Sequence, residues 1–174
     1  MDAKRVARAG VMVALLAVSA QVMMPIGPVP FTLQTMVLAM IPAVLDRGTA
    51  VLSVAAYVLL GAFGLPVFAG FMGGFGSLVG PTGGFLWGFV LGMIAAGAMD
   101  RPFATRISAF PRALVSSFLL LLVTYACGTV QLMALMSLDV TGALGIAVMP
   151  FVIPDVIKVV VGARIGVSIS KVLS

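Results

Sequence analysis

The sequence has no histidine and no glutamate, and Cys127 is its single cysteine. A lone cysteine cannot form an intrachain disulfide. Without histidine, and with only five scattered aspartates, the chain lacks the ligands of an ordinary transition-metal site. The phosphate-binding Gly-Lys-Ser/Thr motif is also missing, which argues against ATP hydrolysis by the usual route. We therefore expect neither a metal ion nor a cofactor.

Charge is scarce as well: charged residues make up 9% of the 174 residues, and hydrophobic residues make up 62%. The mean hydropathy is +1.27, and soluble domains have apolar contents of only roughly 45–50%. The apolar runs are too many for a single anchor, so we expect an integral membrane protein in a lipid bilayer. A net charge of +5 would suggest nucleic-acid binding in a soluble protein. Here it is better explained as a topology signal, and we expect no nucleic-acid partner.

The apolar runs predict an all-α fold: a bundle of six transmembrane helices that forms one domain over residues 1–174. Several runs are shorter than the ~20 residues that a span needs, so we expect the helices to extend into the neighbouring loops. The first run follows a basic start, but with five more runs behind it we interpret it as a retained helix rather than a signal peptide. The predicted segments are residues 6–24, 31–45, 49–63, 85–99, 113–136 and 150–173.

Basic residues lie at both ends of the chain and in alternate loops. The remaining loops, residues 25–30, 64–84 and 137–148, contain no lysine or arginine. The positive-inside rule therefore places both termini in the cytoplasm and these three loops outside. The charged residues that carry this prediction are Lys4, Arg5, Arg8, Asp46, Arg47, Asp100, Arg101, Arg106, Arg112 and Lys171.

The last segment contains an acid and a base, Asp155 and Lys158, three residues apart and thus on one helical face. A charge at the bilayer centre costs on the order of 3 kcal/mol, so such residues tend to be paired and functional. The pair either holds helices together or binds a polar ligand that carries an anion, and we favour the second interpretation. Arg164 lies deeper, where we expect snorkelling or a helix–helix contact.

The loop at residues 64–84 contains eight glycines, two prolines and no charge. Its apolar side chains favour a loop folded over the outer mouth of the bundle, with glycine backbone close to a ligand. A re-entrant plug without a ligand is the alternative. The second segment opens with polar residues, of which Gln34 is either a link between helices or a wall of a cavity. The candidate contacts from these two stretches are Gln34, Thr35, Phe68, Phe71, Gly73, Gly74, Gly83 and Gly84.

Small residues form a stripe along the first helix, at spacings of four and three: Ala3, Ala7, Gly10, Ala14 and Ala17. Such stripes mark close packing in membranes. The stripe either packs inside this chain or docks on a separate subunit, and its extension to Ala3 favours a partner at the cytoplasmic surface. Gly88, Gly92, Ala95 and Ala96 predict a second close-packing face in the fourth segment.

Four stretches together resemble the BioY family, the biotin-specific S-components of energy-coupling-factor transporters. They follow one another in the family's order across nearly the whole chain. They are PVPFTLQT at residues 28–35, GLPVFAG at 64–70, GPTGG at 80–84 and PDVIK at 154–158. One departure is Phe85, where the family commonly has tyrosine after Thr-Gly-Gly.

The resemblance implies a substrate-binding subunit without catalytic activity, in the plasma membrane of a prokaryote. Such a subunit captures biotin from outside and associates with a transmembrane coupling subunit and two ATPase subunits. The resemblance also implies that Asp155 and Lys158 contact the ligand. The family's docking motif is similar to the stripe of Ala3, Ala7, Gly10 and Ala14. If the tyrosine hydroxyl of other members contacts ligand, that hydrogen bond is missing here.

Biotin fits the pattern because it combines a polar ureido ring, an apolar thioether ring and a carboxylate. Asp155 can accept from ureido N–H groups, and Lys158 can donate to a carboxylate or carbonyl. An S-component for another vitamin, such as thiamin or a flavin, is the main alternative. An intramembrane lipid-modifying enzyme would need clustered carboxylates or a nucleophile with a base, which the sequence does not offer. A purely structural scaffold would leave the charged pair unexplained.

Overall fold

The computed structural model describes residues 2–103 and 107–173, without the side chains of residues 100–103. These residues form a helical fold with one two-stranded antiparallel sheet, in which Met23 pairs with Thr32 and Met24 with Phe31. In chain order the elements are α1 (Ala3–Gln21), β1 (Met23–Met24), β2 (Phe31–Thr32), α2 (Gln34–Val44), α3 (Arg47–Ala62), the 3-10 helix η1 (Ala69–Phe71), α4 (Phe75–Val79), α5 (Gly83–Phe103), α6 (Ala109–Met136), α7 (Val140–Ala147) and α8 (Val152–Leu173).

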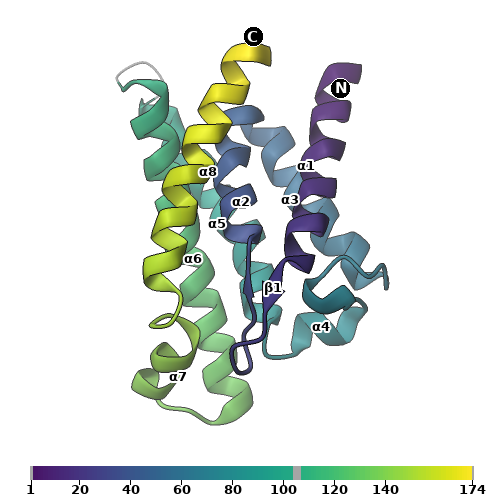
Figure 1. Ribbon diagram of the computed structural model, residues 1–174, viewed down its shortest axis with the longest axis vertical. Coiled ribbons are helices and arrows are strands. Elements are labelled where there is room, and N and C mark those ends of the chain that lie inside the picture. The colour runs from purple at the N-terminus through teal and green to yellow at the C-terminus, as the bar shows by residue number, and fades with distance from the viewer. Residues whose placement is uncertain (1, 104–106, 174) are drawn as a thin grey trace.

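The two ends of the bundle differ. Figure 1 shows both termini at one end, whereas the β1–β2 hairpin, α4 and α7 lie toward the other end. At the terminal end, Arg8 donates to the carbonyl of Leu173 over 2.7 Å, and Asp46 caps α3 by accepting from the N–H of Thr49. The hydrogen bond from the Thr49 hydroxyl holds the pKa of Asp46 below its usual value. Of the residues used to predict the topology, Arg106 and the side chains of Asp100 and Arg101 lie outside the described part.

Glycines allow the long helices to pack with their backbones in contact. A Cβ atom on Gly162 of α8 would overlap the carbonyl of Met36 in α2. Cβ atoms on Gly88 and Gly92 of α5 would lie 2.7 Å from Thr124 Cα and 2.8 Å from the carbonyl oxygen of Leu120, both in α6. Spacings of four residues keep these glycines on one face. The predicted close-packing role of Gly88 and Gly92 is confirmed.

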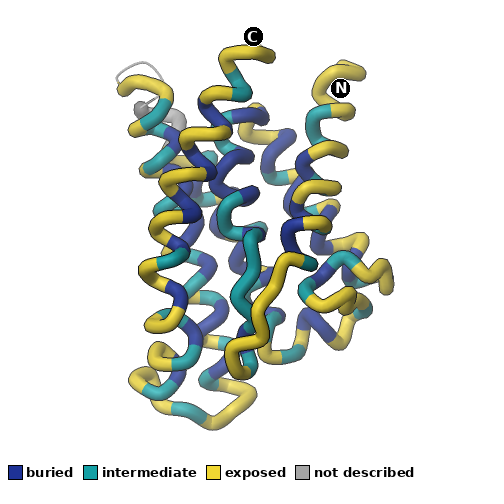
Figure 2. The backbone as a smooth tube through the Cα atoms, viewed as in Figure 1, coloured by how far each residue is buried: buried dark blue, intermediate teal, exposed yellow. Residues whose placement is uncertain are grey.

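Apolar side chains fill the centre of the bundle and also cover its outside. Buried positions face inward along the long helices (Figure 2), and Tyr57, Leu16, Leu38 and Ile41 are fully enclosed. Outward-facing residues such as Leu122 and Val130 are apolar and exposed, as expected for contact with lipid. Among the described residues, α6 alone is long and apolar enough to cross a membrane by itself, and α7 with α8 meets the same test as one span bent by 51°.

Each of the six predicted segments overlaps one helix, and these helices range from the 11 residues of α2 to the 28 residues of α6. The prediction of the loops between them was wrong in one place. Helix α7 forms where we expected a loop, because Asp139 caps it by accepting from the N–H of Gly142. The glycine-rich segment at residues 64–84 contains two short elements, η1 and α4. The second segment also differs: it opens with strand β2, and its helix begins only at Gln34.

Candidate ligand-binding cavity

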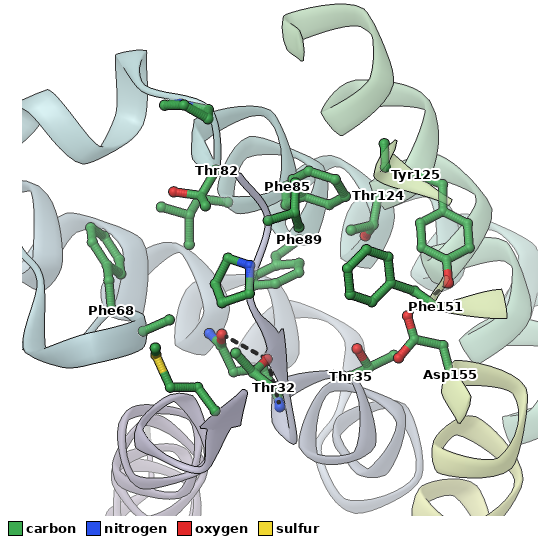
Figure 3. Close-up of a pocket in the computed structure, with 18 of the residues that line it drawn as sticks. Thr32, Thr35, Phe68, Thr82, Phe85, Phe89, Thr124, Tyr125, Phe151 and Asp155 are labelled. Atoms are coloured by element: carbon green, nitrogen blue, oxygen red, sulfur yellow. Dashed lines mark hydrogen bonds between the residues drawn. The ribbon is translucent and has the colours of Figure 1, made fainter. Parts of the chain in front are cut away.

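A cavity of about 480 Å³ lies between the hairpin, the 64–84 segment and helices α2, α5, α6 and α8. Figure 3 shows its wall, on which aromatic rings from several elements surround a few polar side chains. The aromatic residues are Phe68 from the glycine-rich segment, Phe85 and Phe89 from α5, Tyr125 from α6 and Phe151 just before α8. The volume is within the range of small-molecule sites, which are mostly apolar with a few polar groups.

The polar part of the wall is centred on Asp155 and Lys158. The Lys158 ammonium lies 2.5 Å from Asp155 Oδ1, and both side chains are more than nine-tenths buried. They belong to the first two turns of α8 and line the cavity together. Burying two charges is unfavourable unless they are paired and hydrogen-bonded. The ion pair between Asp155 and Lys158 provides this pairing.

Strand β2 supplies two further contacts to Lys158. The ammonium donates to the carbonyl of Thr32 over 2.7 Å and lies 3.8 Å from the centroid of the Phe31 ring. The carbonyl is available because this stretch is extended rather than helical, so helix formation does not use it. Thr32 also belongs to the lining of the cavity.

Tyr125 of α6 completes the surroundings of Asp155. Its hydroxyl donates to Asp155 Oδ2 over 2.7 Å. Asp155 Oδ1 faces Lys158 but makes no hydrogen bond of good geometry. A carboxylate oxygen offers two acceptor positions. Asp155 therefore retains capacity to accept a hydrogen bond from a ligand.

A second group of hydrogen bonds links β2 to the glycine-rich segment. The Thr32 hydroxyl donates to Gln34 Oε1 over 3.1 Å, and Gln34 Nε2 donates to the Tyr57 hydroxyl over 2.8 Å. The Tyr57 hydroxyl in turn donates to the carbonyl of Val67 over 2.9 Å. Gln34 is thus both a wall of the cavity and a link between helices, the two roles between which the sequence could not choose.

Phe68 forms part of the cover of the cavity. Its ring packs edge-on against Tyr57, with ring centroids 5.6 Å apart, and the residue is buried. The carbonyl of Phe68 accepts from Gln21 Nε2 over 3.1 Å, and the N–H of Phe71 donates to Gln21 Oε1 over 2.8 Å. One amide of α1 therefore holds the backbone at the residue before η1 and at the last residue of η1.

The structure brings half of the predicted contacts to the cavity: Asp155, Lys158, Gln34, Thr35 and Phe68. Phe71 is not among the lining residues. Its ring is 71% exposed on the outside of the loop, because residues 70 and 71 both have positive φ and turn the chain away.

The four predicted glycines, Gly73, Gly74, Gly83 and Gly84, do not line the cavity either; instead they allow close packing. Cβ atoms on Gly73 and Gly83 would overlap the carbonyls of Leu65 and Leu78. Gly74 has a φ of 90°, which disfavours any other residue. Gly84 faces the backbone of α6 at Cys127. These glycines shape the loop around the cavity.

Several lining residues escaped the sequence analysis, among them Thr124, Tyr125, Phe89 and Phe151. Tyr125 could have been chosen as a candidate because it is one of few polar residues in its segment. The other three resemble many residues elsewhere in this apolar sequence, so no sequence pattern distinguishes them. Phe85, noted as a departure from the family pattern, lines the cavity and packs its ring on Gly128.

Two other predictions concern residues away from the cavity. Arg164 is exposed on α8 and lies 5.6 Å from the centroid of the Phe110 ring in α6, which confirms a helix–helix contact.

On α1, the stripe residues Ala3, Ala7, Gly10 and Ala14 are all exposed. These four do not pack inside this chain, whereas Ala17, the last residue of the stripe, is half-buried against the core. Within the described residues, no group of three or more Cys or Asp side chains could hold a metal ion.

Comparisons with known proteins agree with this geometry. The model of the BioY family matches residues 1–174. The chain is 42% identical to a biotin transporter of Thermotoga maritima over 97% of this chain and 96% of that one. It is 38% identical to a probable biotin transporter of Pyrococcus horikoshii over 91% of each chain. The crystal structure of the S-component for biotin from an ECF-type ABC transporter superposes with a TM-score of 0.88 over 97% of this chain and 91% of that one, and at 24% identity this match establishes the fold.

Proposed function

Because this chain belongs to the BioY family, we propose that it is the substrate-binding subunit of a vitamin importer of the energy-coupling-factor type. In this proposal it captures biotin from outside a prokaryotic cell. It has no catalytic activity of its own, and ATP hydrolysis by separate subunits drives uptake.

The observation that carries the proposal is the buried pair of Asp155 and Lys158 on the wall of an apolar cavity. Asp155 Oδ1 can accept from a ureido N–H, and Lys158 can donate to a carbonyl or carboxylate. The rings of Phe68, Phe85 and Phe151 suit the thioether ring and the alkyl chain. A ligand with polar groups at both ends and an apolar middle therefore matches the wall.

The proposal includes a membrane arrangement of six spans, namely α1, α2, α3, α5, α6 and α8, with both termini in the cytoplasm. The difficult span is α2, whose 11 residues cover only about 16 Å at 1.5 Å per residue. A hydrocarbon core is about 30 Å thick. Strand β2 and the hairpin continue this crossing, which is possible because β2 is paired with β1 and contacts Lys158.

The partners in this proposal are a transmembrane coupling subunit and ATPase subunits. The exposed stripe of Ala3, Ala7, Gly10 and Ala14 supports a docking surface on α1, since a Cβ on Gly10 would meet no atom within 4 Å. Small residues let another helix approach closely. The stripe therefore provides room for a partner helix.

Calorimetry on the detergent-purified chain tests the ligand. We expect biotin to bind with a measurable Kd, and Lys158→Ala to weaken binding by at least about 100-fold, because it removes the buried ammonium that donates to the carbonyl or carboxylate of the ligand. Arg164→Ala is the matched control, as this residue is a cation on the same helix outside the cavity. It should bind like the wild type.

Two outcomes would contradict the proposal. Tight binding of thiamin or riboflavin without binding of biotin would assign the cavity to another vitamin. Wild-type affinity in a folded Lys158→Ala variant would show that the ion pair is not part of the site. Lys158→Met, which keeps the apolar stem, provides a second variant if the alanine variant does not fold.

A further inference from the structure

Thr124 of α6 places an unpaired hydroxyl at the cavity. Its Oγ1 is buried and has no hydrogen-bond partner among the described residues, and the residue is only 4% exposed. Thr124 belongs to the cavity lining, one residue before Tyr125. In Figure 3 its side chain points toward the other lining residues, between Phe85 and Tyr125.

The lack of a partner needs an explanation because threonines in helices usually satisfy their hydroxyl locally. The backbone carbonyl four residues earlier is the common acceptor, and membrane helices use it routinely. This chain does so elsewhere: the hydroxyls of Ser53 and Ser168 donate to the carbonyls of Thr49 and Arg164. A buried hydroxyl left unpaired is unfavourable, and each such group in a native structure calls for a reason.

The position of Thr124 on the cavity wall suggests why its hydroxyl has no partner within the protein. The wall includes the rings of Phe85, Phe89 and Phe151, which lie near Thr124 in Figure 3 and offer no strong hydrogen-bonding group. The Asp155 and Lys158 side chains are already paired with each other. A hydroxyl can both donate and accept, so Thr124 can serve either kind of polar atom on a ligand.

We propose that Thr124 is a further ligand-binding residue, whose hydroxyl forms a hydrogen bond with a polar atom of the bound vitamin. This inference rests on the proposed function, since it takes the cavity as the biotin site. The ligand satisfies a group that the empty protein leaves unpaired, so ligands without a polar atom at this point bind less well.

Thr129 offers a matched control on the same helix. It is also buried and its Oγ1 is also unpaired, but it is not among the residues that line the cavity. The experiment is calorimetry with biotin on the purified wild type and on Thr124→Val, Thr124→Ser and Thr129→Val. Valine keeps the shape of threonine and removes the hydroxyl, whereas serine keeps the hydroxyl.

We expect Thr124→Val to weaken biotin binding by about 5–20-fold, the usual effect of losing one hydrogen bond to a ligand in a dry site. Thr124→Ser should stay within about threefold of the wild type, and Thr129→Val within about twofold. The midpoint of thermal unfolding of the ligand-free Thr124→Val variant should not fall, because the substitution removes an unpaired polar group.

The proposal is overturned if Thr124→Val binds biotin as tightly as the wild type, or if Thr124→Val and Thr129→Val lose affinity equally. The second result would indicate a packing effect of α6. If the valine variants do not fold, Thr124→Ala and Thr129→Ala provide the same comparison. Failure of the wild type itself to bind biotin would instead refute the proposed function, so the two failures are distinguishable.

Discussion

Gln21 shows how one side chain can hold the cover of the cavity. Its amide donates to the carbonyl of Phe68 and accepts from the N–H of Phe71. Phe71 has a φ of 58°, a conformation that is unfavourable for a bulky residue and needs support from its surroundings. By fixing the backbone at the residue before η1 and at the last residue of η1, Gln21 keeps the Phe68 ring in the cavity wall.

We therefore predict that Gln21→Ala loosens the cover without unfolding the bundle. Loss of two neutral hydrogen bonds, each contributing roughly 1 kcal/mol, should speed biotin dissociation by about 3–30-fold. Hydrogen exchange should also become faster at the Phe71 amide. Exchange mass spectrometry and dissociation kinetics measure the two effects.

Gln131→Ala is the control, because Gln131 donates to the carbonyls of Leu78 and Gly80 at the other end of the same segment. This variant should speed exchange around α4 and leave the Phe71 amide unchanged. Unaltered exchange at Phe71 in Gln21→Ala would show that the 3-10 turn is held by other contacts.

At this scale the sequence predicted residues that are rare in their surroundings and missed those that are common. Asp155 and Lys158 stood out because charges are scarce in apolar segments. Phe68 and Phe71 looked equivalent, and only the turn between them sends one ring inward and the other outward. Glycines such as Gly73 were ambiguous, because close packing, positive φ and ligand contact all favour glycine.

Among the elements, α1 is notable for using two different faces. Met12 and Leu16 are buried in the core, whereas Ala3, Ala7, Gly10 and Ala14 are exposed on another face. An exposed stripe of small residues offers little packing with lipid but allows close approach of a helix. This division fits a helix that serves the fold with one face and a partner subunit with the other.

The predicted consequence is that Gly10→Leu spares biotin binding and impairs transport. The new side chain has open space in the isolated chain but would fill the gap needed by a partner helix, at a cost of about 1–3 kcal/mol. Biotin uptake by cells that also express the coupling and ATPase subunits should fall by roughly 5–100-fold. Calorimetry on the purified chain should show an unchanged Kd.

Leu15→Phe serves as the control, since Leu15 is also exposed on α1 but lies five residues from Gly10, which places it about 140° away around the helix at 100° per residue. Its uptake should match the wild type. Normal uptake in Gly10→Leu would remove the docking role from this face.

The long helices could be predicted from apolar runs, but the small elements that build the cavity could not. Helices α4 and α7 have 5 and 8 residues, too short for a periodic pattern to stand out in a sequence that is apolar almost throughout. The β1–β2 pairing joins residues on either side of a proline-rich turn, and it depends on contacts such as that of the Thr32 carbonyl with Lys158. Such long-range contacts leave no local signal.

For the whole molecule, the difference between the two ends predicts the direction of transport. The cavity is lined at one end by hairpin residues such as Met23, Pro25 and Gly27. The termini lie at the opposite end (Figure 1), near the basic residues Arg5 and Arg8. By the positive-inside rule we expect the hairpin end to face outward, so that the cavity receives biotin from outside.

Cysteine labelling in whole cells tests this predicted orientation. Because Cys127 is the single cysteine, Cys127→Ala gives a background without thiols, into which one reporter cysteine is placed. Gly145→Cys in α7 has open space, and Val172→Cys near the end of α8 is at a position 86% exposed. A membrane-impermeant maleimide should label Gly145→Cys in intact cells, and Val172→Cys only after permeabilisation. The reverse pattern would place the hairpin end of the cavity in the cytoplasm, and the chain could then not capture an external vitamin through it.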